Sequence, residues 1–221
     1  MNWPAPTSTA VVRISTTSGA VNVVAEPGRS EIGSNRELIE VSPATIDAGS
    51  HRVDCRVPEG TDLVIGSTSG RVRVEGRVGS VSVLTTSGRI SIQHAVTVDA
   101  RSKSGRIEIT RADGECRVVN GSGRVEIVRC GAADVTSTSG RLSIGEANGE
   151  VRARGTSGRI EMTLTGAHDV DAETLSGRIE IVLPAAVRPQ IVASASAVDP
   201  GVGDCVVVAR STSGRVVVTN G

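Results

Sequence analysis

The sequence contains no phenylalanine, no tyrosine and a single tryptophan, Trp3. Because aromatic side chains supply much of the buried area in ordinary globular cores, their near absence predicts an interior too narrow for an aromatic ring. Proteins that bind single-stranded nucleic acids usually stack the bases on aromatic side chains, and this chain offers no such platform. Glycine is abundant, with 26 residues, which indicates many corners with a positive φ.

The sequence also lacks an excess of charge. It has 24 lysines and arginines and 24 aspartates and glutamates, so the formal net charge is zero. Nucleic-acid binding usually requires a basic excess, so we expect no nucleic-acid partner. No apolar run is long enough to cross a membrane, and the first ten residues do not resemble a signal peptide. We therefore expect a cytoplasmic protein without a membrane span.

Residues with recognisable chemistry are few and scattered. The four cysteines form no Cys-x-x-Cys pair, which argues against a zinc or redox site; Cys55 and Cys116 fit a core pattern, whereas Cys130 and Cys205 are near turns and are expected to be more accessible. The histidines occupy different positions relative to the repeat described below, so we do not expect them to converge. We expect no catalytic residues, no metal and no cofactor, and therefore no enzyme. The histidines are His51, His94 and His168.

A repeat centred on Ser-Gly dominates the chain. Ser-Gly-Arg occurs eight times, and a ninth copy has alanine after the glycine. The central repeats are separated by 17 to 19 residues, whereas the first gap is 51 residues and the last is 37. The glycines are Gly19, Gly70, Gly88, Gly105, Gly123, Gly140, Gly158, Gly177 and Gly214.

Apolar residues alternate with polar ones on both sides of each glycine. The positions two and four residues after it, and five and seven residues before it, are apolar in every copy, counting cysteine. This period of two predicts two half-buried strands per repeat. Because the same pattern recurs at a fixed period, it favours stacked coils over antiparallel hairpins. The sequence therefore predicts an all-β, parallel β-solenoid (β-helix) with two short strands per 17–18-residue coil, and right-handed crossovers are the expected sense.

Two proline-containing stretches, 26–61 and 184–204, interrupt the pattern where the ends of a solenoid need protection from edge pairing. We expect a single β-solenoid domain over residues 1–221. Its predicted parts are an N-terminal coil and cap (1–61), regular coils (62–183) and an irregular C-terminal coil and cap (184–221).

The sharpest predicted surface feature is a stripe of arginines, one after each Ser-Gly. Such a stripe could bind a phosphate-rich or sulfated polymer. A simpler interpretation, which we favour, is charge pairing with the glutamates two residues further on, Glu108, Glu126, Glu161 and Glu180. The arginines are Arg71, Arg89, Arg106, Arg124, Arg141, Arg159, Arg178 and Arg215.

The glycine-centred repeats, the run Pro-Glu-Gly-Thr-Asp-Leu at 58–63 and the closing strand-turn-strand at 206–219 resemble a known group. They are similar to a bacterial family of β-strand-repeat proteins that carries an adhesin name and is otherwise of unknown function. The resemblance implies a parallel β-helix-like fold and supplies no catalytic residues.

Three functions are consistent with these observations. The first is a non-enzymatic scaffold or binding module that holds an unknown protein or polymer partner on its repetitive faces. The second is a self-assembling structural solenoid similar to the bactofilin cytoskeletal proteins, forming homo-oligomers through its ends or edges. The third is a carbohydrate-active β-helix enzyme, which would need paired carboxylates in a groove.

Overall fold

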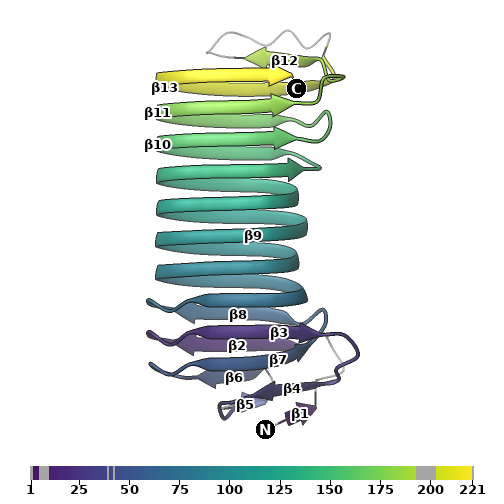
Figure 1. The fold of residues 1–221 in the computed structure, drawn as a ribbon, viewed down its shortest axis with the longest axis vertical. Coiled ribbons are helices and arrows are strands. Elements are labelled where there is room, and N and C mark those ends of the chain that lie inside the picture. The colour runs from purple at the N-terminus through teal and green to yellow at the C-terminus, as the bar shows by residue number, and fades with distance from the viewer. Residues whose placement is uncertain (1, 5–9, 39, 42, 193–202, 221) are drawn as a thin grey trace. The chain divides into compact units, whose positions relative to one another are not determined.

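The computed structural model describes residues 2–4, 10–38, 40–41, 43–192 and 203–220, which form strands and no helix. The chain divides into two compact units, Met1–Asp113 and Gly114–Gly221. The long strand β9 contributes residues 72–113 to the first unit and 114–147 to the second. Within each unit the strands stack in parallel coils, as Figure 1 shows. The predicted all-β solenoid is therefore confirmed, whereas the right-handed sense and the single-domain boundaries stay predictions.

The strands follow one another in thirteen elements. They are β1 (Asn2–Pro4), β2 (Val11–Thr16), β3 (Val21–Glu26), β4 (Glu31–Ser34), β5 (Glu40–Val41), β6 (Ala44–Asp47), β7 (Val53–Pro58), β8 (Asp62–Ser67), β9 (Val72–Ala147), β10 (Val151–Leu164), β11 (Val170–Leu183), β12 (Pro189–Val192) and β13 (Cys205–Asn220).

In the first unit the coils are not stacked in chain order. β2 pairs in parallel with both β6 and β8, and β3 pairs in parallel with both β7 and β9. The first coil of the chain, β2–β3, therefore lies between the second coil, β6–β7, and the third. This order accounts for the gap of 51 residues, because Gly70 lies directly on the carbonyl of Gly19 while the residues between them form a coil on the other side.

The observed N-terminal cap is smaller than the one predicted from the sequence. Residues 44–58 form a regular parallel coil whose inward side chains, Val53, Cys55 and Val57, are buried. The irregular part consists of β4, β1 and β5. These strands add to the coil in antiparallel orientation, β4 on β7, β1 on β4 and β5 on β6. The end of the parallel stack is thus covered by short antiparallel strands, which protect an open edge.

In the second unit, equivalent residues of successive coils lie in register. β10 pairs with β9 and β11, and β11 pairs with β13, so that Gly158 is opposite both Gly140 and Gly177. β12 precedes β13 in the chain but lies outside it, pairing Pro189 with Cys205. β12 thus covers the coil of β13 although it comes earlier in the chain. The separation of 37 residues between Gly177 and Gly214 leaves room for this arrangement.

The predicted inward positions form the core. All of the apolar residues at the four repeat positions are buried except Val216 and Val218, which are half-buried in β13. Like residues stack on like, as in the column of Leu142, Ile160 and Ile179. Valine, isoleucine and alanine fill this narrow interior, which explains why the chain can do without aromatic residues.

In several coils the chain stays in strand conformation through the Ser-Gly corner instead of forming a turn. β10, β11 and β13 each run through it without a break, so in these coils the two predicted strands form one continuous, bent strand. At Gly19 and Gly70 the two strands stay separate, as β2 and β3 and as β8 and β9. At Gly158, φ is +127°, and a Cβ atom would overlap the carbonyl oxygen of Gly140 in the adjacent coil. Glycine is required there because the two backbones approach too closely for any side chain.

A buried polar column, absent from the predicted core, lies three residues before the corner glycines. Some of its hydroxyls serve the corner backbone: Ser67 Oγ accepts a hydrogen bond from Gly70 N–H at 3.0 Å, and Ser137 Oγ donates to Ser139 O at 3.4 Å. Asn120 differs, because it is 1% exposed and its amide has no partner among the described residues. The buried members are Thr16, Ser67, Thr85, Ser102, Asn120, Ser137 and Thr174.

Candidate functional site

The predicted arginines are brought together within each unit. We call them the arginine column: Arg71, Arg89 and Arg106 in the first unit, and Arg124, Arg141, Arg159, Arg178 and Arg215 in the second. In the second unit Arg159 is in register with both Arg141 and Arg178, and Arg178 with Arg215. Adjacent coils are about 4.8 Å apart, so these side chains form a closely spaced row.

Charge pairing neutralises only part of the arginine column. Three of the four expected pairs are present, each at 3.1 Å: Arg106 with Glu108, Arg159 with Glu161 and Arg178 with Glu180. The fourth, Arg124 with Glu126, is absent. Within the described residues no ion pair is found for five members of the column, Arg71, Arg89, Arg124, Arg141 and Arg215. All five are exposed, so their guanidinium donors are available to a ligand.

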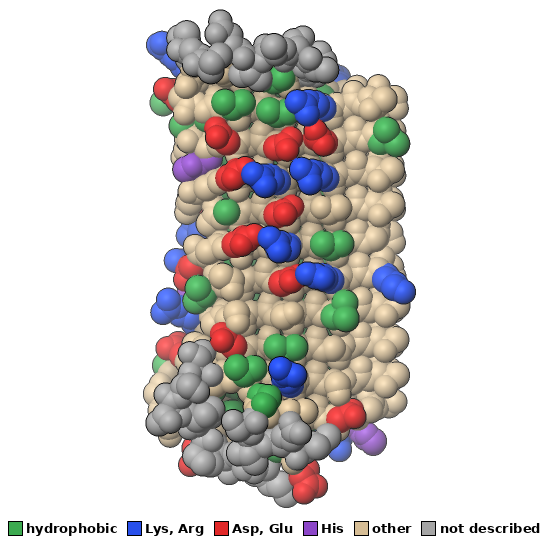
Figure 2. All heavy atoms as spheres, turned by 180° about the vertical axis from the view of Figure 1, so that it is seen from behind, with side chains coloured by type: hydrophobic (Ala, Val, Ile, Leu, Met, Phe, Trp, Pro, Cys, Tyr) green, Lys and Arg blue, Asp and Glu red, His purple; other side chains and the backbone are tan. Residues whose placement is uncertain are grey.

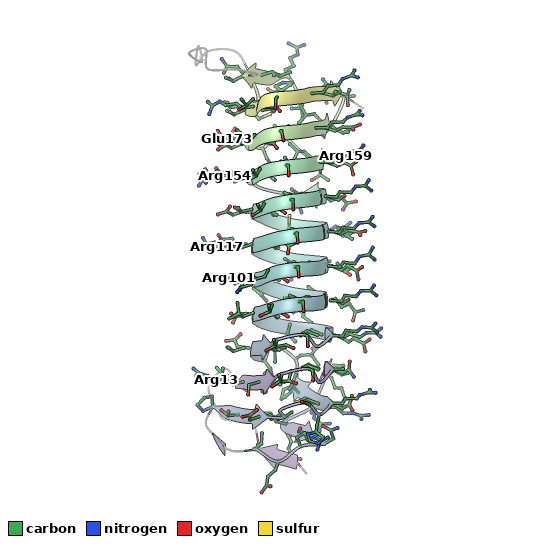
Figure 3. The ribbon with its side chains drawn as sticks, turned by 90° about the vertical axis from the view of Figure 1, so that its left-hand side faces the viewer. Arg13, Arg101, Arg117, Arg154, Arg159 and Glu173 are labelled. Carbon is green, nitrogen blue, oxygen red and sulfur yellow. The ribbon has the colours of Figure 1, made fainter. Side chains whose placement is uncertain are left out.

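The opposite face of the second unit is electrically different. In Figure 3, Arg117, Arg154 and Glu173 point to one side of the coils, and Arg159 of the arginine column points to the other. Here the charges are paired in sequence and between coils, as in Arg152 with Glu150 at 2.7 Å and Arg210 with Glu173 at 2.9 Å. Figure 2 shows basic and acidic side chains interleaved on this face. This side is close to neutral, whereas the side of the arginine column keeps free positive charge.

A second candidate site is a cleft of about 540 Å³ in the first unit, which we call the N-terminal cleft. It lies over the outward side chains of β3 and β7 and is bordered by β4. The size is within the usual range for small-molecule sites. Its walls are formed by Asn22, Val24, Arg29, Gly33, Ser34, Asn35, Asp54, Cys55 and Arg56.

Asp54 is at the centre of the polar contacts in this cleft. Its carboxylate accepts hydrogen bonds from Asn22 Nδ2 at 2.8 Å, Arg52 Nε at 2.9 Å and Asn35 Nδ2 at 3.3 Å. These donors, the Asn22 amide first and then Arg52, hold the pKa of Asp54 below its usual value. Asn35 is itself fixed, because its Oδ1 accepts the backbone N–H of Asp54 at 2.8 Å.

Two arginines supply the positive charge of the N-terminal cleft, and both contact Glu26. Arg29 Nη1 lies 2.9 Å from Glu26 Oε2, and Arg56 Nη1 lies 3.3 Å from Oε1. Arg29 also donates from Nε to the backbone oxygen of Glu31 at 2.6 Å. One carboxylate thus faces two guanidinium groups.

Carboxylates also line a second groove in the first unit, of about 510 Å³, to which Glu59 and Asp62 contribute. Asp62 has a structural contact there, because its Oδ1 accepts the backbone N–H of Ser80 at 2.6 Å. Nearby in the same unit, Asp113 accepts hydrogen bonds from Arg111 at 2.7 Å and from His94 at 2.9 Å. These two contacts, Arg111 first, lower the pKa of Asp113.

The remaining reactive groups are dispersed or buried. Among the described residues, no group of three histidine, cysteine or acidic side chains is arranged to hold a metal ion. All four cysteines are free and buried, so the expected accessibility of Cys130 and Cys205 is wrong. Burial raises the pKa of Cys55 to about 12 and that of Cys130 to about 11. The part of the chain that the structure describes includes no helix long and apolar enough to span a membrane.

The N-terminal cleft was not predicted because most of its residues come from the stretch 26–61, which was interpreted as an irregular cap. A signal was present in the alternation of Val53, Cys55 and Val57, which marks a regular strand with Asp54 and Arg56 facing outward. The contact between Asn22 and Asp54, 32 residues apart, depends on the exchanged order of the coils, which the repeat spacing does not reveal.

Comparison with known proteins places this architecture in a family. A family model described as Toastrack DUF4097 matches residues 49–203, and it represents a domain of unknown function with a β-repeat fold. No curated protein and no solved structure matches the chain. The adhesin name carried by the family that the sequence resembles is not part of that description. Because the matched segment is well over half of the 221 residues, the chain belongs to the Toastrack DUF4097 family.

Proposed function

We propose that the protein is a non-enzymatic binding module that holds an extended, acidic polymer along the arginines of the column in the second unit. The observation that carries this proposal is the asymmetry between the faces. In the second unit, five arginines of the column stand beside three glutamates, and Arg124, Arg141 and Arg215 form no ion pair with any described residue. Arginine presents several donors to sulfate, phosphate or carboxylate groups, and a rigid row of them can engage successive groups on one chain.

The spacing of the coils supports a polymeric ligand over a compact one. Equivalent arginines recur about every 4.8 Å along the stack, comparable to the length of one sugar residue in a polysaccharide. The strands beneath are held in register by backbone pairing, so little conformational entropy is lost when a chain binds. The sequence lacks the aromatic platform on which single-stranded nucleic acids stack, so a sulfated or carboxylated polysaccharide suits this face better than a nucleic acid.

The experiment compares two triple variants of equal net charge. The first replaces Arg124, Arg141 and Arg215 with glutamine, and the second replaces Arg117, Arg152 and Arg154 on the opposite face. Binding of heparin fragments is measured by biolayer interferometry at several salt concentrations. Each lost contact is worth about 0.5–1 kcal/mol, so the column variant should bind about tenfold more weakly or worse. The opposite-face variant should stay within about twofold of the wild type.

Four results would refute the proposal or a part of it. Equal weakening by both variants would mean that heparin responds only to net charge, and no binding by the wild type would remove the basis for an anionic ligand. Single-stranded DNA serves as a competitor; if it binds more tightly than heparin, the polysaccharide assignment is wrong. Release of new reducing ends from heparin, dependent on the protein, would contradict the non-enzymatic part.

Self-assembly is less well supported by the structure. A filament of stacked solenoids needs accessible parallel edges, yet in the first unit β4 and β5 cover β7 and β6 in antiparallel orientation. In the second unit, β12 begins with Pro189, which cannot donate a backbone hydrogen bond to a further strand. Analytical ultracentrifugation over a range of concentrations tests this directly, because concentration-dependent growth beyond small oligomers would favour the structural role.

A further inference from the structure

The N-terminal cleft contains a more specific combination of groups than the arginine column. We infer that it binds a small hydroxylated monocarboxylate, such as a monomeric sugar acid, with its carboxylate on Arg29 and Arg56 and its hydroxyls on Asp54 and Asn22. This inference is independent of the proposed polymer binding, because it concerns other residues and a ligand of different size.

The basic side of the cleft has one positive charge in excess and can therefore bind one anionic group. Glu26 holds both Arg29 and Arg56 but can neutralise only one of them. The Arg29 side chain is 19% exposed, and contacts through Nε and Nη1 fix its guanidinium group. The N–H donors of Nη2 are therefore held in a fixed position. Arg56 is 67% exposed, and its Nε and Nη2 have no partner within the part of the chain that the structure describes. Charge-assisted hydrogen bonds from such a pair favour a carboxylate.

The side of the cleft that contains Asp54 and Asn22 is suited to neutral hydrogen-bond donors. The charge of Asp54 is already balanced by Arg52, which approaches Oδ1 through both Nε and Nη2 at 2.9 Å. An ammonium group would therefore find no unpaired negative charge there. A hydroxyl needs only a lone pair, which Asp54 can still offer. Asn22 donates to Asp54 through Nδ2, and its Oδ1 has no partner among the described residues. This difference favours a sugar acid over an amino acid.

The surface between these two sides is suited to a saturated ring. Val24 is half-buried in the wall of the cleft, and Gly33 and the buried Cys55 add backbone rather than side-chain bulk. The C–H face of a sugar ring can lie against such a surface while its polar edge meets the charged groups. Small-molecule sites commonly combine an apolar contact with a few fixed polar groups, and a volume of about 540 Å³ holds one monosaccharide with ordered water.

The test is isothermal titration with sodium D-glucuronate, D-glucose and L-alanine. Glucuronate should bind saturably and at least tenfold more tightly than either of the others, since glucose lacks the carboxylate and alanine replaces the hydroxyls with an ammonium. Arg56→Gln should weaken glucuronate binding at least fivefold. Arg101→Gln, an exposed arginine on the opposite face of the same unit, is the matched control and should leave binding unchanged.

A second variant distinguishes the loss of a ligand contact from misfolding. Asn22→Ala leaves both arginines in place and should weaken glucuronate binding at least threefold while the melting temperature confirms a folded protein. The inference is overturned if glucuronate does not bind saturably, if glucose or alanine binds as well, or if Arg56→Gln and Arg101→Gln behave alike. Because these probes are monomers, a negative result with glucuronate says nothing about heparin binding by the arginine column. A negative result with heparin likewise says nothing about the N-terminal cleft.

Discussion

Replacing Gly158 by alanine should destabilise the second unit severely. The backbone at Gly158 has φ of +127°, where an L-residue costs about 1–3 kcal/mol. The added Cβ would overlap the carbonyl oxygen of Gly140 and lie 2.9 Å from its carbonyl carbon and nitrogen. Relief requires the two coils to separate at this corner, where Ser157 pairs with Ser139 and Gly158 with Gly140. Each buried backbone group left without a partner costs about 1–3 kcal/mol, so the total loss should be about 3–5 kcal/mol.

The matched control is Gly155→Ala, three residues away in the same coil. A Cβ at Gly155 would meet Thr174 Oγ1 at 3.5 Å and Ile160 Cδ1 at 3.6 Å, which are ordinary contacts. This change should be neutral or stabilise by up to about 1 kcal/mol, because alanine reduces the entropy of the unfolded chain.

Thermal unfolding followed by circular dichroism distinguishes the two variants. In a chain of this size, 1 kcal/mol shifts the melting temperature by about 2–4 °C, so a loss of about 3–5 kcal/mol should make Gly158→Ala melt about 6–20 °C below the wild type. A Gly158→Ala protein that melts within about 2 °C of Gly155→Ala would refute the close approach of the coils as the reason for glycine at the corner.

Three further predictions concern buried and titrating groups. Asn120→Ser should raise the melting temperature by about 2–4 °C, because it removes a buried amide that has no partner among the described residues and puts in its place a hydroxyl that can bond locally; a lower melting temperature would indicate that the amide is satisfied in solution. Asp113 has a lowered pKa in the folded state, so its contribution to stability is present above its unfolded pKa of about 4 and is lost as the pH falls through the folded value. Asp113→Asn should therefore lose less stability than the wild type between neutral pH and about pH 3, and parallel melting curves would contradict this. The thiols should not react with Ellman's reagent in the native protein and should all react in guanidinium chloride, since burial raises the pKa of each one; fast labelling of the native protein would contradict the burial of Cys55, Cys116, Cys130 and Cys205.

The local pattern was sufficient for the repeat unit because inward and outward side chains alternate strictly in an extended backbone. Ile107 and Glu108 illustrate this: adjacent in sequence, one is buried and the other pairs with Arg106 on the surface. The same parity makes the position three residues before the corner inward as well, as at Ser137, but the identity of the residues there concealed it. Its residues are polar, and a buried hydroxyl that bonds its own corner has the composition of an exposed one.

What the sequence determined by itself is the coil: its period, its inward residues and the glycines at its corners, all of which depend on contacts between neighbours in the chain or between identical positions of successive repeats. Only the tertiary structure decided the order of the coils in the first unit and the arrangement of charge. The coil β2–β3 lies between β6–β7 and the third coil because several coils with the same inward pattern can stack in more than one order, and long connections permit each order at little entropic cost. The N-terminal cleft exists because of that order, which brings Asn22 beside Asp54. Likewise, the spacing suggested that glutamates would neutralise the arginines, but side-chain geometry left Arg124, Arg141 and Arg215 without ion pairs in the described part of the chain. That outcome is set by rotamers and neighbouring side chains rather than by the repeat.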